Sequence, residues 1–310
     1  MMIIIRTAVG SMAAVGLIEE LKRNGVRVVG TDCDPLSVGF YFCDKSYVVP
    51  NGHDPNFVRE IIKIAKKEKA DAIISGPEEE LICLSKNKKE IESAGSLLLI
   101  PDYDSVKICA DKKKTSQFFE KIGIKVPRIF ENADSAIFPC IVKPRFGRGS
   151  SGVFKAADKT ELEFYLKKVK NPIIQQFIEG EEYTVDIFAD FKGEPLSIVP
   201  RMRIKIDSGI SVKAKTVFNK EIIDYCEKIT EKLKLFGPSC IQCIKNKKGI
   251  YFLEINARFG GGSILSIKSD PAIISNLIKI AKREKPIKSK GFKDGFQMLR
   301  YYSEIYDDKI

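Results

Sequence analysis

The chain has 310 residues, more than one ordinary hydrophobic core holds, so we expect two or three domains. Its 44% hydrophobic and 30% charged residues are typical of a globular chain and exclude a disordered one. No apolar run approaches the ~20 residues of a membrane span, and Arg6 interrupts the first such run. The sequence therefore predicts neither a transmembrane helix nor a signal peptide, and we expect a cytoplasmic protein.

The charge is basic: 52 Lys and Arg against 41 Asp and Glu give a formal net charge of +11. The lysines are scattered along predicted helical faces, and there is no tryptophan to stack on bases, so we expect surface lysines and no nucleic-acid partner. Eight cysteines with a single histidine predict buried thiols rather than disulfides or a zinc site.

Predicted strands alternate with predicted helices over residues 1–100. The strands are 2–7, 26–31, 72–75 and 97–100, and the helices are 12–24, 55–68 and 78–87. Strands separated by crossover helices predict a parallel sheet covered on both faces. Ligands bind at the carboxyl ends of such strands, where Gly10, Asp32 and Asp34 lie, but the glycine spacing does not match a dinucleotide-binding motif.

The pattern changes after a helical stretch at 102–122. Strands at 140–145 and 153–156 flank a glycine-rich loop, and a helix at 160–168 precedes a strand at 173–177. The remaining predicted elements are β-rich segments at 183–189, 195–203 and 211–217, a helix at 221–233, a hairpin of 240–245 with 250–255, a helix at 271–283 and a returning strand at 296–302. Long β-rich segments in succession predict an antiparallel sheet.

Two lysines are candidates for binding phosphate. Lys143 ends a strand and precedes the loop 146–152, which has three glycines whose backbone N–H groups can wrap an anion. In a strand–loop–strand context this loop would be a flap over phosphates; an ordinary glycine-rich turn is the alternative. Asp111 is expected to cap a helix, where Lys112 adds a second charge or is simply solvated.

Oxygen ligands gather on a second segment. Glu254 and Asn256 lie two apart on a strand and so share a face, which Arg258 joins if the strand continues. Gln242 lies on the preceding strand of the hairpin. Such oxygens suit Mg²⁺, although an exposed polar strand face gives the same pattern.

A third segment suits a nucleoside. Residues 175–178 offer backbone donors and acceptors with apolar side chains for an adenine, and Glu182, after the turn at Gly180, can bind ribose hydroxyls. Any glycine-containing hinge could look similar.

In this order, these motifs resemble those of the ATP-grasp superfamily over about residues 108–265, and most nearly the carbamoyl-phosphate synthase large-subunit-like and carboxylate–amine ligases. The resemblance implies an α/β (α+β ATP-grasp) fold in which a Rossmann-like pre-ATP-grasp domain precedes two ATP-grasp subdomains. We place the pre-ATP-grasp domain at 1–105, the small subdomain with its flap at 106–178, and the large subdomain at 179–310.

The resemblance also implies roles for single residues. The ATP contacts would be Lys112, Lys143, Gly147, Gly149, Ser150, Ser151, Gly152, Gln175, Gln176, Phe177, Ile178 and Glu182. Mg²⁺, or Mn²⁺ in its place, would bind Gln242, Glu254 and Asn256, while Arg258 and Lys143 would be catalytic. Many members have Glu where this chain has Gln175 and Gln242.

The implied reaction is ATP-dependent ligation of a small carboxylate, an amino acid or a related compound, to an amine through an acyl phosphate, releasing ADP and phosphate. An ATP-binding regulatory module without turnover is the alternative. Candidates for holding the substrate carboxylate are Arg201, Arg203, Lys213, Gly261 and Gly262; for the first two, simple surface charge is the competing explanation. Relatives are often dimers, so a homodimer is expected.

Overall fold

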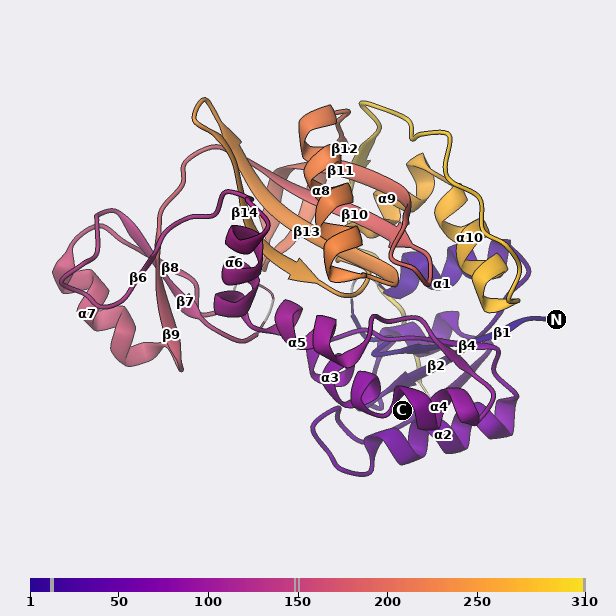
Figure 1. The fold of residues 1–310 in the computed structure, drawn as a ribbon. Coiled ribbons are helices and arrows are strands. Elements are labelled where there is room, and N and C mark those ends of the chain that lie inside the picture. The colour runs from indigo at the N-terminus through magenta and orange to yellow at the C-terminus, as the bar shows by residue number, and fades with distance from the viewer. Residues whose placement is uncertain (12–13, 148, 150, 309–310) are drawn as a thin grey trace.

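The computed structural model describes residues 1–11, 14–147, 149 and 151–308. It contains a five-stranded, a six-stranded and a four-stranded sheet with helices packed on them. In Figure 1 the five-stranded sheet lies below the six-stranded one, and the four-stranded sheet projects to one side. The chain thus has the mixed α/β architecture that the sequence predicts.

The N-terminal sheet is parallel and has the strand order β3-β2-β1-β4-β5. Its strands are β1 (Ile3–Thr7), β2 (Arg27–Asp32), β3 (Lys45–Val48), β4 (Ala72–Ile74) and β5 (Leu97–Leu98). The connecting helices are α1 (Ala14–Arg23), the 3-10 helix η1 (Val38–Phe42), α2 (Phe57–Glu68), α3 (Glu78–Lys86) and α4 (Lys88–Ser93). The predicted parallel sheet is confirmed; β3, η1 and α4 were not predicted.

The two faces of this sheet pack into two different hydrophobic clusters. Ile5 packs in one buried cluster with α2 and α3, whereas Ile4 packs in another with α1. The second cluster also holds Phe188 and Phe236 of the C-terminal part of the chain. A continuous apolar core therefore joins the N-terminal domain to the large sheet.

A break at Asp111 divides the predicted helical stretch 102–122 into α5 (Tyr103–Ala110) and α6 (Lys112–Lys121). The Asp111 carboxylate accepts hydrogen bonds from the backbone N–H of Lys113 (3.0 Å) and Lys114 (3.3 Å). Asp111 also accepts two bonds from the Arg145 guanidinium, at 2.8 and 2.7 Å. The predicted N-cap is confirmed, and it ties α6 to the base of the glycine-rich loop.

The four-stranded sheet has the order β6-β9-β7-β8. Its elements are β6 (Ile129–Phe130), β7 (Cys140–Pro144), β8 (Phe154–Ala156), α7 (Lys159–Lys168) and β9 (Pro172–Gln176), packed around a small core of their own. The predicted domain boundaries at residues 105 and 178 stay predictions.

The six-stranded sheet has the order β14-β13-β10-β11-β12-β15, and its pairs are antiparallel. Its strands are β10 (Glu181–Ala189), β11 (Pro195–Asp207), β12 (Ile210–Thr216), β13 (Gly237–Asn246), β14 (Gly249–Asn256) and β15 (Gln297–Leu299). The helices are α8 (Lys220–Leu233), α9 (Ser263–Ser269) and α10 (Ala272–Ala281). The predicted hairpin is confirmed, while α9 was not predicted.

The last described residues return to the N-terminal domain (Figure 1). The backbone N–H of Arg300 donates to the carbonyl oxygen of Val212 at 3.0 Å, and Tyr41 on η1 donates to Asp307 at 2.5 Å. Among the described residues, none of the helices is long and apolar enough to cross a membrane.

Candidate active site

Two lysines lie close together at the base of the glycine-rich loop. Lys143, at the end of β7, is only 7% exposed, and Lys112, at the start of α6, is similarly buried. Burial lowers the pKa of Lys143 to about 8; the Glu254 carboxylate opposes this shift and the Lys112 charge adds to it. Lys143, Lys112 and Glu254 are therefore electrostatic neighbours, although they come from three separate segments.

The glycine-rich loop lies next to these two lysines. Gly147, Gly149 and Gly152 all have positive φ, a backbone conformation that side chains disfavour. Lys112 Nζ donates to the Gly147 carbonyl oxygen at 2.6 Å. Gly149 packs against the β11–β12 turn so closely that a Cβ on Gly209 would lie 2.6 Å from its carbonyl group. Ser151 is exposed on the same loop, and Ser150 lies outside the described residues.

The three predicted metal ligands lie together. Gln242 on β13 pairs directly with Glu254 on β14, and Asn256 Nδ2 donates to Glu254 Oε1 at 3.1 Å. Arg258 Nη2 donates to Asn256 Oδ1 at 3.2 Å, and its Nη1 donates to the Phe259 carbonyl oxygen at 3.0 Å. Within the described chain, Arg258 forms no ion pair with a carboxylate. One carboxylate and two amide oxygens thus lie beside a guanidinium that lacks a carboxylate partner.

The predicted adenine segment follows β9. Gln175 is buried, and its Nε2 donates to the Pro127 carbonyl oxygen at 3.3 Å. Gln176 is exposed on the opposite face, Phe177 lies beneath the Lys155 ammonium, and Ile178 is buried. Glu182, the predicted ribose ligand, forms an ion pair with Arg203.

A cavity of about 480 Å³ lies between the carboxyl edge of the parallel sheet and the six-stranded sheet. Predicted site residues line it: Gly149, Arg201, Arg203, Gln242, Glu254, Asn256, Arg258, Gly261 and Gly262. Gly10, Asp32 and Asp34 line its other side. The cavity therefore joins the metal-side residues to the edge of the N-terminal sheet, whereas Lys112, Lys143 and residues 175–178 lie outside its lining.

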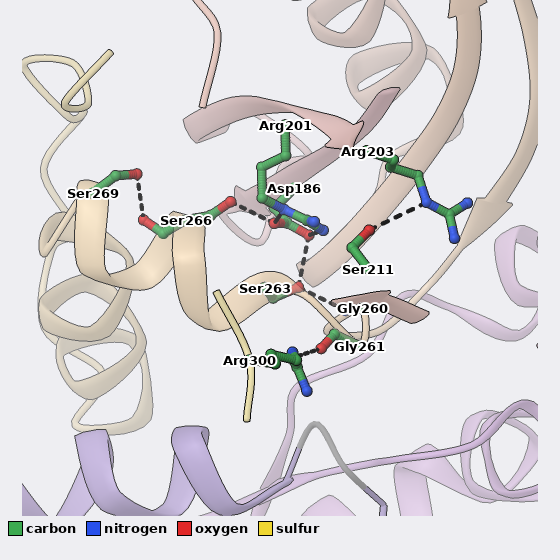
Figure 2. A network of polar contacts seen from close by, with 10 residues as sticks. All are labelled: Asp186, Arg201, Arg203, Ser211, Gly260, Gly261, Ser263, Ser266, Ser269 and Arg300. Carbon is green, nitrogen blue, oxygen red and sulfur yellow. Dashed lines mark hydrogen bonds and ion pairs between the residues drawn. The ribbon is translucent and has the colours of Figure 1, made fainter. Parts of the chain in front are cut away.

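Arg201 is held by a buried network (Figure 2). Its Nε and Nη2 donate to Asp186 on β10 at 2.5 and 3.2 Å. Asp186 also accepts bonds from Ser263 (2.6 Å) and Ser266 (2.5 Å) of α9, and the Ser263 hydroxyl accepts the Gly260 N–H at 2.7 Å. Asp186 thus neutralises Arg201 and fixes the loop 260–262.

The structure does not bring Lys213 into the cavity. Arg203 lines the cavity, whereas Lys213 is exposed and does not line it. The pairing of β11 with β12 shifts between Arg203 and Lys205, so a regular alternation of faces does not hold along this stretch. Arg203 itself donates to Glu182, to the Ser211 hydroxyl and to the Gly209 carbonyl oxygen.

Four further charged residues of this site were not among the candidates predicted from the sequence. Burial raises the pKa of Glu78 to about 7, and its electrostatic neighbours are Arg258 and Lys112. Burial likewise raises the pKa of Glu80 to about 7, although Thr7 and Ser75 donate hydrogen bonds to its carboxylate. Arg6 and Asp186 are the two others. For Arg6 and Asp186, the sequence signal that could have found them is a charged residue inside an otherwise apolar predicted strand.

Comparison with known families agrees with this geometry. Residues 109–262 match the family model of the ATP-grasp domain. Residues 4–99 match the model of the PylC-like N-terminal domain. Residues 109–262, about half of the chain, therefore belong to the ATP-grasp superfamily, which confirms the predicted resemblance. The preceding residues 4–99 match a PylC-like N-terminal domain.

Individual relatives match over different lengths. The carbamoyl phosphate synthase large chain of Clostridium botulinum is 26% identical over 79% of this chain and 25% of its own length. The D-alanine–D-alanine ligase of Fusobacterium nucleatum is 33% identical over 49% of this chain and 58% of its own length. The chain therefore spans about a quarter of the first relative and less than two thirds of the second.

A solved structure shares the fold. The biotin carboxylase domain dimer of the Hydrogenobacter thermophilus 2-oxoglutarate carboxylase, in complex with MgADP, ADP and bicarbonate, superposes with a TM-score of 0.72. The match covers 91% of this chain and 70% of that chain at 16% identity. The predicted ATP-grasp fold is therefore confirmed.

Proposed function

We propose that this chain is an ATP- and Mg²⁺-dependent, ADP-forming ligase that joins a small carboxylate, an amino acid or a related compound, to an amine. The observation that carries the proposal is the cavity, which places Glu254, Asn256 and Arg258 opposite the carboxyl edge of the N-terminal sheet. Residues suited to bind a phosphoryl group and residues at the edge of the N-terminal sheet, where a substrate would bind, thus line the same cavity.

The residues present fit the two implied cofactors. The oxygens of Glu254, Asn256 and Gln242 are the hard donors that Mg²⁺ prefers, and a single carboxylate leaves positions for phosphate oxygens. When bound, Mg²⁺ would neutralise charge on the phosphates of ATP. Lys112, Lys143 and the loop 147–152 would hold those phosphates, and residues 175–178 the adenine.

In the proposed reaction, an oxygen of the substrate carboxylate attacks the γ-phosphorus of ATP, the bond to the β-phosphate oxygen breaks, and an acyl phosphate and ADP form. A neutral amine then attacks the acyl carbon, inorganic phosphate leaves and the nitrogen loses a proton. Lys143 and Arg258 would stabilise the negative charge of the transferred group. The closed loop around Gly149 would exclude water, which hydrolyses acyl phosphates.

The test is release of ADP from MgATP with a panel of paired amino acids. Lys143→Ala and Glu254→Gln should each lower turnover by ~100-fold or more, because each removes a charge next to the reacting phosphate. Lys167→Ala and Glu231→Gln are matched controls on exposed helix positions and should behave like the unsubstituted chain. Unchanged turnover in Lys143→Ala would contradict the assigned site.

An ATP-binding regulatory module is the second candidate. It predicts MgATP binding by calorimetry without release of ADP for any substrate pair. Arg258 forms no ion pair with a carboxylate of the described residues, which favours catalysis, because a module that only binds nucleotide has no need of such a charge beside the predicted metal ligands. We also propose a homodimer, which sedimentation would test.

A further inference from the structure

Arg6, on the central strand β1, is a buried arginine that forms no direct ion pair with a carboxylate of the described residues. It is 2% exposed and lines the cavity. Its Nη1 donates to the carbonyl oxygens of Thr7 (2.7 Å) and Ile74 (3.4 Å). Its Nε is buried with no hydrogen-bond partner. Within the described part of the chain, both printed bonds of the guanidinium come from Nη1, and Arg6 forms no ion pair with a carboxylate. Burial lowers its pKa to about 10, so Arg6 is still a cation at neutral pH.

Arg201 provides a comparison within the same cavity. It is equally buried, at 1% exposed, but it donates two hydrogen bonds to Asp186. Buried charges in proteins are normally paired in this way, because an unpaired charge in the interior is costly. Arg6 is a buried charge beside a cavity and lacks such a partner among the described residues. We therefore expect the partner of its guanidinium to be a ligand bound in the cavity.

The position of Arg6 in the fold supports a ligand. The chain runs outward from β1 through β2 to β3 and then crosses to β4 on the other side. Open α/β sheets bind ligands at such a switch point, at the carboxyl ends of the strands. Gly76 follows β4 there, and a Cβ at this position would lie 3.0 Å from Arg6 Nη1, so the glycine keeps space beside the guanidinium.

The surrounding charges indicate what the ligand carries. Glu80, Asp32 and Arg258 are the acidic and arginine side chains that act electrostatically on Arg6. Glu80 is bonded to Thr7, Ser75 and the Gly76 N–H. Asp32 accepts only backbone N–H groups, from Gly10 (2.7 Å) and Asp34 (3.0 Å), and no Lys or Arg of the described residues forms an ion pair with it. An arginine and a carboxylate, neither of which forms an ion pair with the described residues, thus line one cavity.

We propose that Arg6 binds a carboxylate group that one substrate keeps through the reaction. The proposal rests on the proposed ligase function. Arg258 adjoins the metal ligand Asn256, so the carboxylate that accepts the phosphoryl group belongs there, and Arg6 is left for a second one. Planar guanidinium donors match a carboxylate in geometry as well as in charge. Asp32, which forms no ion pair with a described Lys or Arg, favours a substrate in which an ammonium group accompanies that carboxylate.

The test is direct binding, which needs no turnover. L-Alanine, D-alanine, propionate, ethylamine and inorganic phosphate are titrated by calorimetry into the full chain and into Arg6→Gln, Arg6→Lys and Arg23→Gln. Arg23 is an exposed arginine on α1, so its substitution removes the same charge away from the cavity. We expect a carboxylate-bearing probe to bind the full chain and Arg23→Gln alike, Arg6→Gln ~10-fold or more weakly, and Arg6→Lys in between.

The thermal unfolding of the ligand-free variants separates binding from a structural role. If Arg6 serves a ligand, Arg6→Gln should unfold at the same or a higher temperature, because an unpaired buried charge is removed. A lower unfolding temperature with unchanged probe affinity would contradict the proposal. So would Arg6-dependent binding of phosphate alone, or no carboxylate binding at all. A chain that never releases ADP but loses alanine binding in Arg6→Gln would refute the ligase and leave the Arg6 assignment standing.

Discussion

The two halves of the candidate site are built differently. On the proposed ATP side, Lys143 and the pair Glu254 and Asn256 lie on regular strands, and each segment carries its own motif. On the proposed substrate side, the cavity wall combines Arg6 of β1, the turn around Gly209 and the loop 260–262, which meet only when the domains pack together. Local patterns therefore specify the first half, and tertiary packing specifies the second.

The largest expected effect tests whether the substrate half depends on its buried network. Asp186→Asn removes the counter-ion of Arg201 and should lower the free energy of unfolding by about 3–5 kcal/mol. Asp224→Asn, which breaks an exposed ion pair with Lys220, is the matched control and should have little effect. At temperatures where Asp186→Asn stays folded, its affinity for MgATP should be unchanged. Equal loss of ATP affinity would mean that the two halves are not separable.

A pH effect on stability should come from Glu80. Its pKa is raised to about 7 in the folded chain from 4.5, so the folded state binds the proton more tightly than the unfolded state. Stability is therefore lost as the pH rises from about 4.5 to 7, by about 3 kcal/mol in total. Chemical denaturation at pH 8 should show Glu80→Gln to be more stable than the unsubstituted chain by up to that amount. A less stable variant would show that the Glu80 charge is compensated.

A smaller pH effect should appear on the ATP side. Because burial lowers the pKa of Lys143 to about 8, its charge is lost as the pH rises further. Affinity for MgATP should then fall by up to ~10-fold per pH unit above about 8, measured by calorimetry. Lys143→Arg keeps its charge in this range and should flatten the profile. A flat profile in the unsubstituted chain would instead mean that Lys143 does not contact the phosphates.

The smallest expected effect separates two neighbouring strands. Lys213→Ala should leave both stability and turnover nearly unchanged, because Lys213 is exposed and does not line the cavity. Arg203→Ala, on the cavity face, should weaken substrate binding and release the Glu182 carboxylate. Equal effects of the two substitutions would support the sequence-based prediction that Arg203 and Lys213 both bind the substrate carboxylate.

The sequence predicted the local placement of the candidate ATP-side residues, because each of their motifs lies within one strand or turn; their roles stay predictions. The alternation that places Glu254 and Asn256 on one face, and the cap at Asp111, are local rules that need no tertiary information. Tertiary pairing is harder to predict. Lys213 was grouped with Arg203 but does not line the cavity with it, because the pairing of β11 with β12 shifts near Lys205 and cannot be counted from a single strand.

Charged residues within buried strands were the other gap. Arg6 was noted only as an interruption of an apolar run, and Asp186 lies unremarked in the apolar strand β10. Whether such a residue is paired, as Asp186 is, or unpaired, as Arg6 is, depends on α9 and on the N-terminal sheet, far away in the sequence. The helix α9 itself follows the glycines 260–262, which read as loop.

The returning C-terminal segment has a mechanical consequence. It is hydrogen-bonded to β12 through Arg300 and to η1 through the contact between Asp307 and Tyr41. The segment therefore links the large sheet to the N-terminal domain. The intervening side chains, Tyr301 and Tyr302 among them, are exposed and accessible to a protease. A single nick there would remove this peripheral link and leave intact the apolar core that joins the two domains.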